Sequence, residues 1–150
     1  YAKRIARAIS EERKLKPIVT TVHLANVVKA AHPRWERHKH PATQTFQAIR
    51  IRINNELEDL KLGLEQSLDV LKIGGRLLVI SFHSLEDRIV KRFIRKQAHA
   101  AVEFKKLPVI PVEWRPRLKS LGRGIKADAY AIKVNPRSRS AVLRIAEKIL

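Results

Sequence analysis

A group of chemically capable side chains follows an apolar run near the middle of the chain. The run Leu77–Phe82 has no polar/apolar alternation and suits a strand that is buried on both faces of a parallel sheet. Ligands of open α/β sheets bind beyond the carboxyl ends of such strands. The side chains at that position are His83, Ser84, Glu86, Asp87 and Arg88. The pattern therefore favours a ligand site directly after residue 82.

The residues that follow this run predict a helix. Ser84 has Asp87 three residues later, which matches an S-x-x-[DE] capping box. Helical spacing then continues at Leu85, Ile89, Val90, Phe93 and Ile94. A second interpretation stays open at this stage, in which Ser84 only caps the helix and His83 only fills the loop.

Several catalytic classes are excluded by the same residues. Adjacent side chains such as His83 and Ser84 cannot meet as base and nucleophile, and no G-x-S-x-G motif is present. Gly122 and Gly124 alone do not make a phosphate-binding loop. Three histidines lie between residues 32 and 40, but no cysteine or carboxylate cluster accompanies them, so we predict no metal site.

The charge balance points to a polyanionic partner. The chain has 32 Lys and Arg against 14 Asp and Glu, which gives a net charge of +18 spread along the sequence. Such a surplus neutralises phosphates and releases counterions, so nucleic acid is the expected partner. No apolar run approaches the length of a membrane span, and we expect no membrane partner. The absence of cysteine is compatible with a cytoplasmic location.

The first part of the chain predicts helices. Residues 2–15 and a segment capped by Thr20 or Thr21 both carry apolar stripes, and His32–Pro33 ends the second. A basic loop follows, in which Trp35 either stacks on a base or anchors the loop. An apolar stripe over Thr43–Leu71 then predicts one continuous helix, about 40 Å long. Its first half is basic and polar on the exposed side, which makes that end a candidate for nucleic acid contact.

The last third predicts shorter elements. Prolines make residues 98–117 irregular. Arg117–Ile125 suits a strand that glycines interrupt, Ala127–Val134 suits a short helix, and Asn135–Pro136 suits a turn. Ser140–Ile145 alternates and predicts a final strand of mixed burial.

Three motifs carry a resemblance to a known family. They are SFHSLEDRIVKRF from Ser81, HPATQTFQAIRI from His40, and NPRSRSAVLRIAEK from Asn135. Their order and spacing resemble the bacterial MraW family, the ribosomal RNA small-subunit methyltransferases H. The resemblance covers essentially the whole chain but only about the C-terminal half of the family's sequence. The chain also has no methionine and begins inside a helical pattern, so we expect it to be part of a longer protein.

The resemblance implies an α/β fold, namely the C-terminal half of a Rossmann-like methyltransferase sheet. Residues 1–41 would end an inserted helical domain, and residues 42–150 would belong to the methyltransferase domain, with Ser140–Ile145 antiparallel to its neighbour. The implied reaction moves a methyl group from S-adenosylmethionine to the N4 amine of a cytidine in 16S ribosomal RNA. The family's cofactor motifs lie upstream of the matched residues, so we expect no cofactor-binding residues and no independent activity here.

We predict an RNA-binding role for polar residues of the three motifs, while the proton acceptor stays unassigned. These residues are His40, Thr43, Arg50, Asn54, His83, Ser84, Asp87, Arg88, Arg137, Ser138 and Arg139. The alternative function is a non-enzymatic basic RNA-binding module, for which the charge alone would be enough. Such a module has no reason to retain the buried strand and all three motifs, which favours the methyltransferase.

Overall fold

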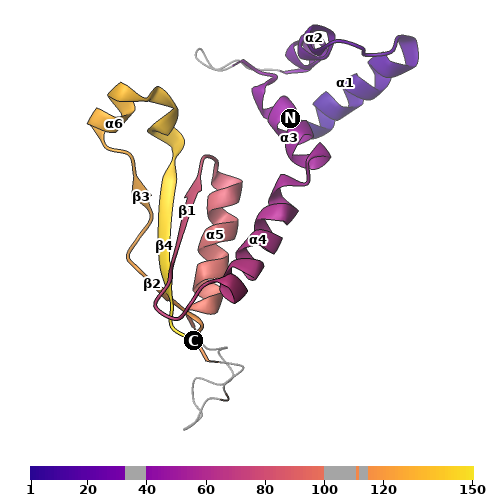
Figure 1. The fold of residues 1–150 in the computed structure, drawn as a ribbon. Helices are drawn as coiled ribbons and strands as arrows, with labels where there is room; N and C mark the ends of the chain where they lie inside the picture. Colours follow the sequence, from indigo (N-terminus) through magenta and orange to yellow (C-terminus); the bar gives the residue numbers. More distant parts are fainter. Residues whose placement is uncertain (33–39, 100–110, 112–114) are drawn as a thin grey trace. The chain divides into compact units, whose positions relative to one another are not determined.

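The computed structural model of the chain is a mixed α/β structure with an antiparallel sheet (Figure 1). It describes residues 1–32, 40–99, 111 and 115–150. The loop with Trp35 and most of the predicted irregular segment therefore lie outside the described residues. The chain divides into two compact units, Tyr1–Glu56 and Leu57–Leu150. The predicted domain boundary after residue 41 stays a prediction.

The first unit consists of three helices, α1 (Ala2–Leu15), α2 (Thr21–Ala31) and α3 (Thr43–Ile53). Helices α1 and α2 confirm the sequence prediction. Thr20 is the N-cap of α2 and its Oγ1 accepts a hydrogen bond from the backbone N of His23 at 3.1 Å. The ring of His23 lies 2.8 Å from Oε1 of Glu12, which joins α2 to α1. Few side chains are buried in this unit, so it has only a small core.

The prediction of one continuous helix over Thr43–Leu71 was wrong. Helix α3 ends at Ile53, and α4 (Glu56–Val70) begins after a two-residue break. Asn55 has φ of 52°, in the left-handed region that asparagine tolerates better than most residues. The helical spacing of apolar residues is the same on both sides of Asn54 and Asn55. The sequence pattern therefore gave no sign of the break.

The second unit is built on a sheet with strand β4 (Val142–Lys148) at its centre. Strand β1 (Arg76–Ser81) pairs with one edge of β4, and β2 (Leu118–Ser120) and β3 (Ile125–Lys126) pair with it as well. All described pairings are antiparallel. The antiparallel final strand is thus confirmed, with later bounds than predicted. A parallel partner for β1 does not occur among the described residues.

Helix α5 (Ser84–Gln97) packs on one face of this sheet, and α4 contributes to the same core. The core is apolar and consists of Leu64, Leu68, Val90, Phe93, Ile94, Leu118 and Ala146. Directly paired residues of neighbouring strands share a face, so Leu77 and its partner Ala146 both point toward the helices. This face holds the unit together.

The other face of β1 contradicts the prediction of a strand buried on both sides. Leu78 and Ile80 are 58% and 59% exposed, and burial alternates along the strand. No element in the described part of the chain covers this face. Leu78 and Ile80 stand at positions where a half-buried strand would have polar residues, and both are exposed to solvent.

The remaining elements follow the predicted order. The predicted interrupted strand is present as β2 and β3, with the glycines between them. Helix α6 (Ala129–Val134) is capped by Asp128, whose Oδ1 accepts from the backbone N of Ala131 at 2.7 Å. The Asn135–Pro136 turn opens a 3-10 helix, Pro136–Ser140, which leads into β4.

Candidate nucleic-acid interface

One end of the sheet gathers most of the predicted site residues of the second unit. Ser81, the last residue of β1, is paired with Val142, the first residue of β4, and Lys126 of β3 pairs with the same residue. The start of α5 and the 3-10 helix Pro136–Ser140 therefore lie at the same end of the sheet, although they are about fifty residues apart in sequence. We call this end of the sheet the open end.

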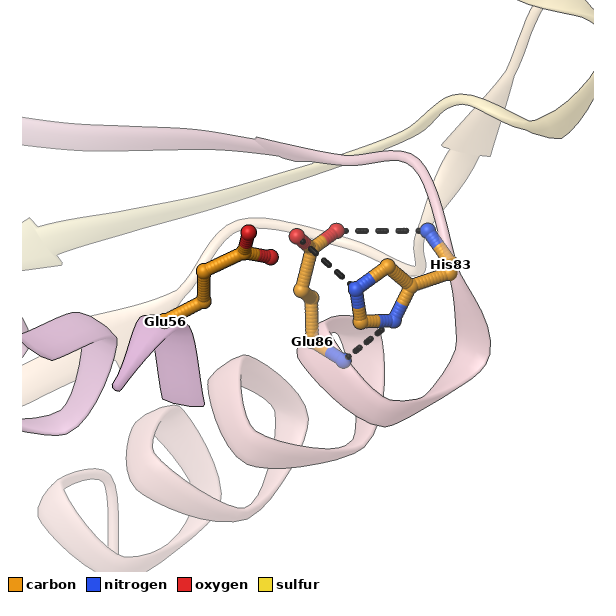
Figure 2. A group of neighbouring side chains, drawn as sticks. All are labelled: Glu56, His83 and Glu86. Carbon is orange, nitrogen blue, oxygen red and sulfur yellow. Dashed lines mark hydrogen bonds and ion pairs between the residues drawn. The ribbon is translucent and has the colours of Figure 1, made fainter. Parts of the chain in front are cut away.

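The loop after β1 is closed by a capping box, and its N-cap is His83 rather than the predicted Ser84. Oε2 of Glu86 accepts hydrogen bonds from the backbone N of Phe82 at 2.9 Å and of His83 at 3.2 Å. Figure 2 shows the bond from His83. In return, Nδ1 of His83 accepts from the backbone N of Glu86 at 3.4 Å. The pairing partner is therefore Glu86, not Asp87. The ring of His83 thus provides the acceptor atom that the sequence analysis assigned to the hydroxyl of Ser84.

The second ring nitrogen of His83 is buried and lacks a hydrogen bond of good geometry. Nε2 lies 3.1 Å from Oε1 of Glu86, close enough for an ion pair but off the direction of a hydrogen bond. The side chain of Ser81 is also buried without a partner in the described residues. Glu56, which Figure 2 also shows, forms an ion pair with Arg50 within the first unit.

Asp87 is held by Arg144 of β4. Nε and Nη2 of Arg144 donate to Oδ1 and Oδ2 of Asp87 at 2.7 and 3.0 Å, a two-pronged pair that is only partly exposed. This hydrogen bonding lowers the pKa of Asp87 below its ordinary value, partial burial opposes the shift, and the charges of Arg144, Lys91 and Lys126 add to it. Sequence analysis missed Arg144, because nothing in a spacing of 57 residues indicates the pair.

The arginines of the open end are exposed. In the described part of the chain, the side chains of Arg88, Arg137 and Arg139 form no ion pair. Ser138 is used in the turn, since its Oγ donates to the backbone O of Asn135 at 2.7 Å. Three cations are thus presented to solvent next to the end of β1.

The predicted residues of the first unit form a separate group at the two ends of α3. Nδ1 of His40 accepts from the backbone N of Ala42 at 3.2 Å, and Thr43 is the first residue of the helix. At the other end, Arg50 lies 2.7 Å from Glu56, and Nδ2 of Asn54 donates to the same carboxylate at 3.4 Å. Within the unit, Arg50 and Asn54 are therefore already engaged.

Comparison with known proteins identifies the family. The family model described as the MraW methylase family matches residues 1–149. The chain belongs to the MraW methylase family. The match extends over both units, so neither is foreign to the family. None of the helices in the described ranges combines the length and the apolar character that a bilayer crossing requires.

Curated members of the MraW family are closely similar to this chain. Proteins of Legionella pneumophila strains Paris, Philadelphia 1 and Corby are each 56% identical to it over 149 residues, which is 99% of the chain. Each is named ribosomal RNA small subunit methyltransferase H. The chain spans 48% of the length of these relatives.

Proposed function

We propose that this chain is the RNA-facing part of an enzyme that methylates a cytidine of small-subunit ribosomal RNA at N4. The proposed donor is S-adenosylmethionine, and the proposed substrate is 16S ribosomal RNA or the small subunit, in the cytoplasm. The observation that carries the proposal is the 56% identity, over 99% of this chain, to relatives named for small-subunit ribosomal RNA methylation.

The open end supports an RNA substrate. Arg88, Arg137 and Arg139 are exposed and unpaired within the described residues, and they lie next to the polar loop that follows β1. Exposed cations bind phosphates and release counterions, whereas the polar groups beside them suit a base edge. An exocyclic amine in folded RNA must be turned out of its stack before an enzyme reaches it. A phosphate-binding rim around a polar loop suits that task.

We propose no contact between this end and the methyl donor. Glu86 accepts hydrogen bonds from two backbone N–H groups and Asp87 from Arg144, so both carboxylates have structural roles here. We therefore assign no cofactor contact and no catalytic step to the described residues.

The test is methylation of ribosomal RNA by the full-length protein. Small subunits from a strain that lacks the gene are incubated with S-adenosylmethionine and the protein, and the RNA is digested to nucleosides for mass spectrometry. We expect N4-methylcytidine to appear only with the full-length protein, and no transfer with these 150 residues alone. RNA binding without any methyl transfer would instead support a non-enzymatic RNA-binding module.

A further inference from the structure

A basic groove runs along α5, away from the loop that follows β1. Its volume is about 450 Å³, within the range of ligand sites in proteins. One wall is α5 and the residues after it, and the other is the β2–β3 turn with part of β4. The residues that line the groove and carry charge or polarity are Lys91, Arg95, His99, Ser120, Arg123 and Arg144.

Among the described residues, the lining contains four cations and no carboxylate. Lys91, Arg95 and Arg123 are exposed and form no ion pair within the described residues. Arg144 is neutralised by Asp87, but the three others are not. Surfaces of soluble proteins usually intersperse both signs of charge. A concave surface with one sign focuses its field and concentrates anions.

The helix presents these cations in a regular row. Asp87, Lys91 and Arg95 are four residues apart, so they follow one another along one face of α5. Each step is about 6 Å along the helix axis. The row begins at the Asp87–Arg144 pair of the open end and continues into the groove. The groove is thus a continuation of the candidate interface.

Two glycines in the turn between β2 and β3 shape the wall of the groove that faces α5. Gly122 has φ of +85°, a conformation that residues with a side chain rarely adopt. A Cβ at Gly124 would lie 2.9 Å from Cγ1 of Val142 and 3.3 Å from Cζ of Arg144. Glycine at this position therefore leaves room for Arg144 to reach Asp87 and line the groove at the same time.

We propose that this groove binds phosphates of the RNA backbone, beyond the nucleotides at the open end. The inference rests on the proposed function, because it assigns the groove to the same RNA. Cations without partners in a concave site are suited to phosphodiester groups. Phosphate contacts of this kind add affinity and fix the register of the protein on its RNA.

The test compares two pairs of substitutions on the same helix in the full-length protein. Lys91→Gln with Arg95→Gln removes two groove cations. Arg92→Gln with Lys96→Gln removes two exposed cations of α5 that do not line the groove. Binding of a ribosomal RNA fragment is measured by fluorescence anisotropy between about 50 and 200 mM salt. Thermal melting verifies that both variants are folded.

We expect the groove pair to reduce the slope of log affinity against log salt by about two, and the matched pair to leave it unchanged. At the lower salt concentration, the groove pair then binds about tenfold more weakly. Equal slopes for the two pairs would overturn the groove assignment while RNA binding and methylation by the parent protein remain. A parent protein that neither binds nor methylates the RNA would instead overturn the proposed function itself.

Discussion

The two ends of strand β4 use positive charge in different ways. At its last residue, Nζ of Lys148 donates to the backbone O of Leu68 at 2.6 Å and of Leu71 at 2.9 Å. Leu68 is in the last turn of α4 and Leu71 directly follows the helix, where carbonyls have no intrahelical N–H partner. At the open end, by contrast, Arg137 and Arg139 have no ion pair within the described residues.

The closed end is also fixed by the backbone. The backbone N of Gly74 donates to O of Lys148 at 2.7 Å, and N of Lys148 donates to O of Gly75 at 2.8 Å. Nearby, Arg117 lies 3.5 Å from Asp69, a weak and exposed pair. Charge at this end joins α4 to the sheet, so it contributes to folding. At the open end, the charges of Arg137 and Arg139 form no ion pair within the described residues, so they remain available to a ligand.

Asp87 forms a two-pronged ion pair with Arg144 at the open end, and its substitution should have the largest effect on stability. Asp87→Asn keeps the volume but leaves Arg144 beside Lys91 and Lys126 without a counter-charge. We expect it to lower the free energy of unfolding by about 2 kcal/mol near neutral pH, between the values for exposed and buried pairs. Denaturant titrations followed by circular dichroism measure the loss.

The effect of Asp87→Asn should depend on pH in one direction. Because the folded-state pKa of Asp87 is lowered from 3.8, its contribution is complete above that value and is lost as pH falls through the folded-state pKa. The variant and the parent should therefore converge in acid, once the pH is below the folded-state pKa of Asp87. Asp69→Asn is the control, and its exposed pair predicts a change within about 0.5 kcal/mol. A difference that persists in acid would contradict the assigned ion pair.

Lys148→Met tests the closed end. Methionine keeps most of the aliphatic side chain but removes both hydrogen bonds to α4. We expect a loss of about 1–2 kcal/mol, because a charge at the helix C-terminus and two hydrogen bonds are removed. Lys72→Met, on an exposed lysine just after α4, is the matched control. An equal loss of stability in both variants would show that the hydrogen bonds from Lys148 to Leu68 and Leu71 contribute nothing specific to folding.

Substitution of the open-end arginines should have the smallest effect on folding and a clear effect on RNA. Arg137→Gln and Arg139→Gln are expected to change stability by less than about 0.5 kcal/mol. Each should reduce the salt slope of RNA binding by about one. Arg76→Gln removes an exposed arginine at the other end of the sheet and is expected to leave the slope unchanged. A uniform effect of all three would show that the whole surface, not one end, attracts RNA.

The sequence predicted elements better than it predicted their junctions. Apolar residues at helical spacing identified α1, α2 and α5, whereas a short uninterrupted apolar run identified β1. The break at Asn54 and Asn55 was missed, because the spacing of apolar residues carries no information about a residue with left-handed backbone conformation. The cap was misassigned to Ser84 because histidine is not among the common N-cap residues, although its Nδ1 is an adequate acceptor.

The candidate site was predictable in content but not in contacts. The motif residues after β1 and before β4 were recognised, and pairing of these strands brings them to one end. The bonds from Arg144 to Asp87 and from Lys148 to α4 join residues 57 and 80 positions apart, so no local pattern reveals them. The burial of β1 was overestimated because apolar composition does not show which neighbours a face has.

The central position of β4 has a consequence for synthesis on the ribosome. β4 is the last described strand to leave the ribosome, yet every described strand pairs with it. Arg76 can pair with Glu147 only after Glu147 has been synthesised, and this pairing closes a long loop between the two residues. Until then the backbone of β1 lacks its partner while Leu78 and Ile80 are already synthesised, and nascent apolar segments of this kind aggregate readily. The nascent chain is therefore expected to depend on chaperones until its final strand has emerged.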